Sequence, residues 1–165
     1  MNLQRQVRSL GVLVLACGVL LLNCAAAQGK KKNKYVCDEP NPASLCTAAN
    51  TCGSASKPCT VDVTKSRYGS NVKPNIPGAT DNQPFCVKKG TTVVWMSSKK
   101  DTGFMVSFGN DSPFTPDDTI MGGGAKQVTV EATTPGCYKY DAGAFISGVV
   151  YGMGSGSKPE LIVLP

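Results

Sequence analysis

The chain has 165 residues, with 17 lysines and arginines, 11 aspartates and glutamates and no histidine, which gives a formal net charge of +6. Without histidine there is no Ser–His or Cys–His pair, so the hydrolases that activate a nucleophile in this way are excluded. Outside a lysine cluster at residues 30–34 the basic residues are scattered and lack interleaved aromatic side chains, which is unlike a nucleic-acid-binding motif.

Residues 1–27 have the organisation of a secretory signal peptide. Two arginines come first, residues 10–22 form an apolar run, and three alanines precede a cleavage site expected before Gln28. The run of about 13 residues is shorter than the roughly 20 that a membrane-spanning helix needs. We therefore expect a secreted or periplasmic protein with no integral membrane segment in its mature chain. Acylation of Cys17 or Cys24, as in a lipoprotein, is the alternative.

Removal of this segment leaves 138 residues, enough for one domain, and six of the eight cysteines. An even number of cysteines in an exported chain predicts a disulfide framework, here formed by Cys37, Cys46, Cys52, Cys59, Cys86 and Cys137. We expect Cys86 to pair with Cys137, because both lie on the outward phase of predicted strands. The absence of a Cys-x-x-Cys motif favours a structural bridge there over a redox-active pair.

Residues 28–59 divide into a lysine-rich leader and a cysteine-rich arm. The lysines of the leader suit either contact with an anionic wall or membrane surface or a solvated tail, and both interpretations stay open. Residues 37–59 contain four cysteines and almost no large apolar side chains, so this segment cannot bury enough surface to fold alone. We expect two disulfides to shape it.

Residues 60–165 have the period of β-strands. Val61 and Val63 alternate with polar residues, and a loop rich in Pro, Gly and Asn then runs to residue 84. Apolar residues recur at every second position in segments at 85–87, 93–95, 104–108, 127–130 and 137–140, and a continuous apolar run at 161–164 closes the chain. A glycine-rich loop is expected at 143–159. Short strands separated by turn residues predict an all-β, two-sheet Greek-key sandwich.

Three motifs in this region resemble a known family. They are Val-Lys-Lys-Gly-Thr-Thr-Val-Val-Trp at 87–95, the strand ending Val-Ser-Phe108, and Thr-Pro-Gly-Cys-Tyr-Lys-Tyr at 134–140. With a closing strand at 160–164, their order and spacing resemble those of cupredoxins of the plastocyanin and azurin type. The resemblance covers residues 60–165 and implies a β-sandwich that, in the family, holds a blue-copper centre for electron transfer.

The ligand positions implied by the resemblance do not hold copper ligands. The first histidine of the family falls on Phe104, and its cysteine falls on Ala142. The following loop, residues 143–148, contains no imidazole, and Met153 would be alone as the late methionine. Because a blue-copper site needs two imidazoles and a thiolate, we expect no type 1 site and no cofactor. Phe104 is expected to fill the space of the missing metal.

Other site chemistries stay open in the sequence. A thioether site for Cu(I) would draw on Met96, Met105, Met121 and Met153, whereas core packing explains the same residues. Asp117 and Asp118 suit either a Ca²⁺ loop or a solvated turn. A secreted hydrolase would need a carboxylate pair drawn from Asp101, Asp111, Glu131 and Asp141.

Aromatic residues in predicted loops suggest a binding surface. Phe145 and Tyr151 lie in the glycine-rich loop, and Tyr68 lies in an earlier one. Exposed aromatic side chains on loops commonly contact proteins or sugars, and for Phe145 and Tyr151 filling the space of the missing metal centre is the open alternative. We therefore expect a non-catalytic binding or structural module, with a protein, a glycan or a cell-envelope component as its partner. Copper handling through methionine or cysteine is the alternative.

Overall fold

The computed structural model describes residues 35, 37, 39–114, 118–152 and 158–165. The predicted signal peptide, the lysines of the leader, Asp117 and Met153 lie outside these residues. The described residues belong to one compact unit. The single helical turn of the described part is the 3₁₀ helix η2 (Pro42–Leu45), so no helix there is suited to crossing a membrane.

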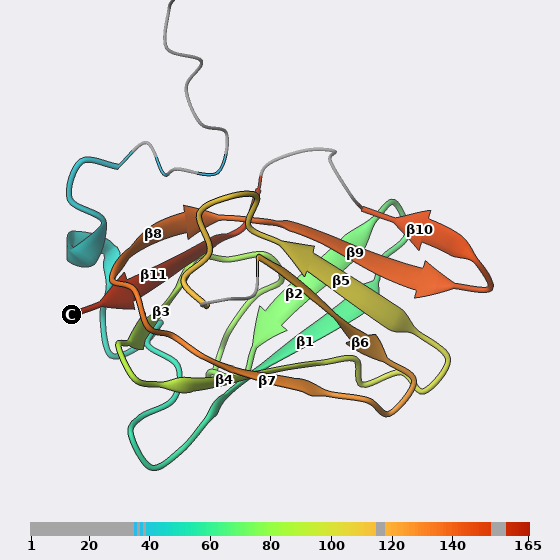
Figure 1. Cartoon of the computed structure of the whole chain (residues 1–165), viewed down its shortest axis with the longest axis horizontal. Helices are drawn as coiled ribbons and strands as arrows, with labels where there is room; N and C mark the ends of the chain where they lie inside the picture. The colour runs from blue at the N-terminus through green and yellow to red at the C-terminus, as the bar shows by residue number, and fades with distance from the viewer. Residues whose placement is uncertain (1–34, 36, 38, 115–117, 153–157) are drawn as a thin grey trace, which may run out of the picture. The chain divides into compact units, whose positions relative to one another are not determined.

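The described residues form an all-β fold, which confirms the predicted fold class (Figure 1). The strands are β1 (Cys59–Lys65), β2 (Ser70–Pro74), β3 (Phe85–Lys88), β4 (Thr92–Met96), β5 (Gly103–Ser107), β6 (Thr119–Gly123), β7 (Val128–Glu131), β8 (Gly136–Lys139), β9 (Asp141–Ile146), β10 (Val149–Tyr151) and β11 (Glu160–Leu164).

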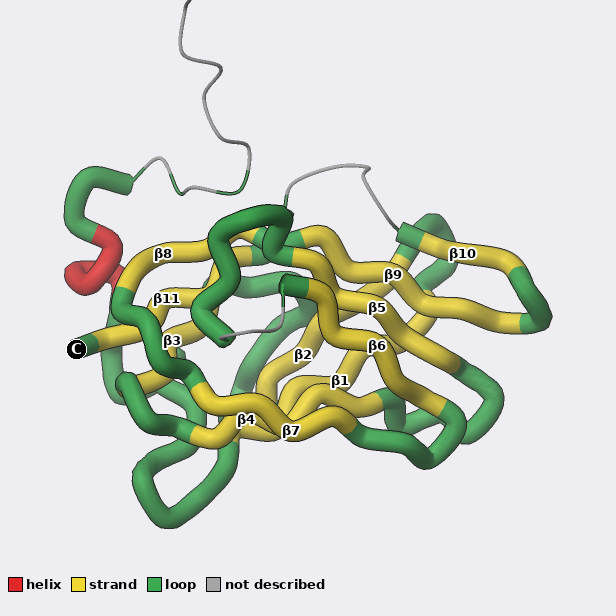
Figure 2. The backbone as a smooth tube through the Cα atoms, in the orientation of Figure 1, coloured by secondary structure: helices red, strands yellow, loops and turns green. Residues whose placement is uncertain are grey.

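These strands make three hydrogen-bonded sheets, in the orders β2-β1-β4-β7, β10-β9-β5-β6 and β3-β11-β8. Tyr140 is the one residue between β8 and β9, so these two strands form a continuous path that joins the second and third sheets (Figure 2). The first sheet packs against the other two around a single apolar core. This arrangement gives the two facing layers of a sandwich-like fold, with one layer divided into two sheets.

The core is centred on aromatic side chains. Trp95 makes edge-to-face contacts with Phe108, Phe114 and Tyr140, at centroid distances of 6.4, 6.3 and 5.7 Å. Trp95 belongs to β4, where the buried residues alternate with partly exposed ones as the period of two predicts. The same alternation places Phe104 and Val106 of β5 inside the core.

The glycine-rich stretch was expected to be a loop, and that prediction is wrong for residues 143–151. They belong to a hairpin of β9 and β10 that turns through Ser147 and Gly148, with φ values of 50° and 79°. Two central residues with positive φ are typical of the type I′ turn, whose twist matches that of paired strands. In the same way residues 70–74, which lie in a predicted loop, pair with β1 as β2.

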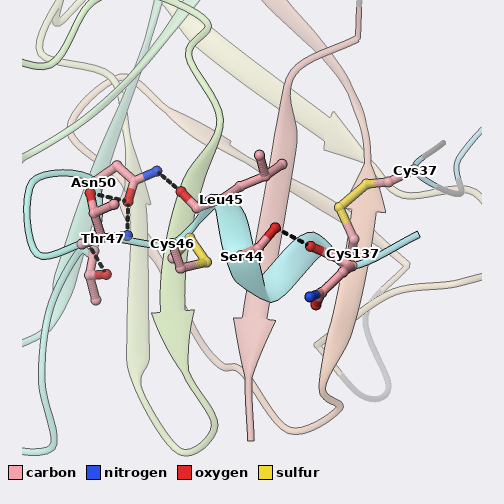
Figure 3. The surroundings of a disulfide bond; sticks show 10 residues. Cys37, Ser44, Leu45, Cys46, Thr47, Asn50 and Cys137 are labelled. Carbon is pink, nitrogen blue, oxygen red and sulfur yellow. Dashed lines mark hydrogen bonds between the residues drawn. A yellow bond between two sulfur atoms is a disulfide. The ribbon is translucent and has the colours of Figure 1, made fainter. Parts of the chain in front are cut away.

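All six cysteines predicted to form disulfides do so. The pairs are Cys37–Cys137, Cys46–Cys86 and Cys52–Cys59, and Figure 3 shows the first with the turn around η2. In that turn the Asn50 side chain accepts a hydrogen bond from the Thr47 amide at 2.7 Å and donates one to the Leu45 carbonyl. One bridge lies within the cysteine-rich arm rather than the two expected, because the other two attach the arm to β3 and β8.

The predicted Cys86–Cys137 bridge is wrong, and sheet geometry gives the reason. Cys86 and Cys137 are both Cα partners of Ile162, one on each side of β11. Neighbouring strands lie about 4.8 Å apart, so the two Cα atoms are on the order of 10 Å apart, beyond the roughly 7 Å limit for a disulfide. Cys86 keeps the predicted outward phase, since Phe85 and Val87 belong to the core cluster and Cys86 does not, but it is fully buried because residues 50–52 of the arm hydrogen-bond to β3 and cover it.

Candidate binding site at the β1–β2 turn

Apolar packing occupies the two positions at which the family resemblance implies copper ligands. Phe104 is fully buried, and its Cα partners on the neighbouring strands are Gly122 and Ala144. A Cβ atom added at Gly122 would lie 2.8 Å from Cζ of Phe104, so the ring uses the space that this glycine leaves. Ala142 is also buried, as the Cα partner of Val106.

The sulfur atoms are divided between bridges and the sheet surface. The described cysteines are all in disulfides, so Glu160, which lies close to Cys37 and Cys137, has no thiolate beside it to share a metal ion. Met105 and Met121 are cross-strand Cα partners, and Met121 is 58% exposed. The structure brings these two predicted thioethers together and places Met96 in a different sheet.

The three predicted binding aromatics do not form one cluster. Phe145 pairs with Gly103 and Val150, and a Cβ added at Gly103 would lie 3.4 Å from Cδ2 of Phe145, so the ring packs on the outer face of the sheet. This is the face of Met105 and Met121, because side chains two positions apart share a face. Tyr151 follows Val150 and therefore points to the opposite face, toward the β1–β2 turn.

The described part of the chain has a polar pocket of about 290 Å³ where that turn meets the β8–β9 junction. We call it the turn pocket; its polar lining includes Tyr68, Ser70, Asn71, Asn82, Asp141 and Lys158. These residues come from four separate stretches of sequence. Tyr68 was predicted as a binding residue and Asp141 as a candidate catalytic carboxylate, whereas the other four were missed, because single polar residues in loops carry no sequence signal of their proximity.

Tyr68 lies at the rim of the turn pocket, and the cations Lys65 and Arg67 are next to the lining residues Ser66 and Tyr68 in the sequence. The turn is closed by a hydrogen bond from the Ser66 amide to the Gly69 carbonyl at 2.9 Å, which leaves Tyr68 85% exposed. The Arg67 guanidinium lies 5.1 Å from the centroid of the Tyr68 ring. Lys65 is the last residue of β1, and its ammonium group lies 4.6 Å from the ring centroid of Tyr151, the last residue of β10. Both arrangements have cation–π geometry.

The floor of the turn pocket is a fixed polar network around Asp141, which is itself buried. The Tyr35 hydroxyl donates a hydrogen bond to Asp141 at 3.0 Å, and Lys158 forms an ion pair with the same carboxylate. Ser70 donates through its hydroxyl to the Ala142 carbonyl at 2.8 Å. A buried charge is stable when it is paired and hydrogen-bonded, and this network meets both conditions.

The other candidate carboxylates lie elsewhere. Asp101, Asp111 and Glu131 are exposed and do not line the turn pocket, and Asp118 is exposed just before β6. Asp141 is thus the one predicted catalytic carboxylate that the structure places at the turn pocket.

Two polar atoms of the aromatic core lack hydrogen-bond partners among the described residues. They are Nε1 of Trp95 and the hydroxyl oxygen of Tyr140, both buried. Burial raises the pKa of the Tyr140 phenol far above its ordinary value. Burial, and secondarily the negative charge of Asp111, also raises the pKa of Tyr138. In both cases the folded state favours the neutral phenol.

Replacing Tyr140 with phenylalanine is expected to stabilise the protein by about 1 kcal/mol, because the buried hydroxyl gains no hydrogen bond to offset its lost hydration. The variant should also resist alkali better. Because the pKa of Tyr140 is raised in the folded state, the wild type keeps its stability below about pH 10 and loses stability as the pH rises above that value, whereas the variant has no phenol at this position to ionise. Urea unfolding between about pH 8 and pH 11 measures both effects. Parallel stability curves for the two proteins would contradict the pH effect.

No protein-family model matches the chain, and no curated protein matches its sequence. Function therefore has to be argued from the site and its chemistry.

Proposed function

We propose that this chain is an exported cupredoxin-like domain that has no type 1 copper site and acts as a non-catalytic binding module. The observation that carries the proposal is the turn pocket, a fixed polar floor with an exposed tyrosine at its rim. The three disulfides suit a domain that works in an oxidising compartment. The partner would be a glycan, a protein or another component of the cell envelope.

The strand connections support the cupredoxin-like, Greek-key part of this proposal. Two pairs of strands distant in sequence, β1 with β4 and β3 with β11, are parallel, whereas the other pairs are antiparallel. The β8–β9 path leads into a hairpin at the place where the family has its copper loop. With Phe104 and Ala142 buried at the implied ligand positions and no histidine in the chain, the fold would keep its scaffold without its metal.

Copper handling is the second candidate, and one observation favours it. Met105 and Met121 lie side by side on the outer face of their sheet, and thioethers select Cu(I). The hydrolase alternative has less support. Its one carboxylate at the turn pocket, Asp141, is already paired with Lys158, whereas glycoside hydrolysis uses two carboxylates with different roles.

Metal analysis separates the first two candidates. We expect protein purified from the exported fraction to contain no stoichiometric copper, and Cu(I) supplied from a chromogenic chelator to remain with the chelator. Met121→Leu, which removes the sulfur but keeps an apolar side chain of similar volume, should behave like the wild type. Stoichiometric copper that is lost in Met121→Leu would establish the copper function instead.

Binding is tested by sedimentation of the mature domain with isolated cell envelopes. Tyr68→Ala is expected to reduce the sedimented fraction, and Phe145→Ala, on the opposite face of the sheet, to leave it unchanged. Equal sedimentation of Tyr68→Ala and wild type would remove the turn pocket as the binding site.

A further inference from the structure

We infer that the turn pocket binds an acidic saccharide, with a sugar ring against Tyr68 and a carboxylate facing Arg67 and Lys65. The inference rests on the proposed binding function and names the class of ligand for that site.

The lining of the turn pocket suits a ligand rich in hydroxyl groups. Its volume of about 290 Å³ is at the lower end of the range for small-molecule sites, which is roughly 300–1,000 Å³. Ser66, Ser70, Asn71 and Asn82 contribute hydroxyl and amide groups to the lining. The Ser70 hydroxyl and the Asn71 and Asn82 side-chain amides already make hydrogen bonds within the protein, and each keeps further donor or acceptor capacity for sugar hydroxyls.

The polar lining is held in place before a ligand arrives. The Asn82 side chain accepts a hydrogen bond from the Val72 amide at 2.8 Å, and the Asn71 amide donates to Asp81. The chain passes close to itself at Gly152, where an added Cβ atom would lie 2.6 Å from the Ser70 amide nitrogen. Because these contacts fix the backbone on both sides of the turn pocket, a ligand would need little further ordering of the protein.

Tyr68 provides a flat apolar surface at the rim. A pyranose ring exposes C–H groups on its faces, and these pack on an aromatic ring while the hydroxyl groups at its edge reach polar partners. Tyr68 is 85% exposed, and its ring has a cation–π contact with the adjacent Arg67. Tyr68 can therefore stack on a sugar ring while the polar groups of the turn pocket bind its hydroxyl groups.

The charges select an acidic sugar. The ammonium of Lys158 is balanced by Asp141 on the floor of the turn pocket. Among the described residues no carboxylate forms an ion pair with Lys65 or with Arg67, which are next to the lining residues Ser66 and Tyr68 in the sequence. Arginine binds a carboxylate through two parallel N–H groups, so a uronic acid on the saccharide would supply the missing negative charge.

The test is calorimetric titration of the mature, disulfide-intact domain with short galacturonate and mannuronate oligomers and with neutral glucose oligomers of equal length. We expect the acidic oligomers to bind more tightly, with an affinity that falls as salt is added. Tyr68→Ala should weaken binding about tenfold, which corresponds to about 1.4 kcal/mol. Arg67→Gln should weaken binding and flatten its dependence on salt.

Two matched controls lie away from the turn pocket. Phe145→Ala removes an aromatic ring from the opposite face of the sheet, and Lys126→Gln removes one exposed positive charge; both should bind like the wild type. Equal binding of neutral oligomers, or an unchanged Arg67→Gln, would overturn the acidic class. Displacement of the oligomers by inorganic phosphate at equal concentration would show a simple anion site and overturn the saccharide.

The failure of this inference can be told apart from failure of the proposed function. If no saccharide binds while sedimentation with envelopes still depends on Tyr68, the binding module stands and its ligand is of another class. If both measurements show no dependence on Tyr68, both proposals are wrong.

Discussion

Truncation of Phe104 to alanine is expected to lower the free energy of unfolding by about 3–5 kcal/mol, a large part of the stability of a domain this size. The side chain is fully buried, and its ring fills the space between Gly122 and Ala144, which are too small to close over a cavity. Urea unfolding followed by Trp95 fluorescence measures the change. A large loss would show that Phe104, at the position where the family resemblance implies a metal ligand, contributes its ring to core packing.

Met105 provides the control, because it is the next residue of the same strand and points to the outer face. Met105→Ala should cost less than about 1 kcal/mol. A similar small loss for Phe104→Ala would mean that the ring contributes little packing energy, and the proposed replacement of metal by packing would lose its main support.

Removal of the Cys37–Cys137 bridge, by the double substitution of both residues with alanine, is expected to destabilise the protein by about 4–5 kcal/mol. The bond joins residues separated by 100 positions, so its loss frees a large part of the unfolded chain. The loss should also weaken the hydrogen bond from Tyr35 to Asp141, because Tyr35 lies two residues before Cys37. Thermal and urea unfolding of the double variant measure the loss, and folding at 37 °C is expected to be marginal.

The Cys52–Cys59 bridge is the internal comparison, because its partners are separated by 7 positions. The chain-entropy relation gives this bridge about 2.4 kcal/mol, roughly half the effect of the longer one. Equal losses for the two bridges would show that local packing at the sulfur atoms, rather than restriction of the unfolded chain, determines their contribution.

The strands that could be predicted from sequence are those with one face in the apolar core and the other partly exposed. β4 and β5 alternate large apolar and partly exposed residues, and this alternation is visible in the sequence. β9 was missed because four of its residues are buried in succession, and two of these are alanines. Small residues there admit the ring of Phe104 from the neighbouring strand, a requirement that the sequence does not reveal.

The candidate site shows the same limit. The sequence singled out Tyr68 because it is an aromatic residue in a loop. Asp141 and Lys158 have no local pattern, and their pairing depends on the fold bringing the β8–β9 junction beside the segment before β11. The sequence also could not show that Phe145 and Tyr151 lie on opposite faces of the sheet, because this depends on the register of the β9–β10 hairpin.

The three disulfides are nested: Cys52–Cys59 lies inside the loop closed by Cys46–Cys86, and that loop lies inside the one closed by Cys37–Cys137. A chain threaded into an oxidising compartment from its N-terminus presents its first thiols long before their native partners emerge. Early oxidation would therefore join neighbours, and thiol–disulfide exchange must shuffle those bonds before the molecule matures. The yield of correctly bridged protein should accordingly depend on a disulfide isomerase in the producing cell.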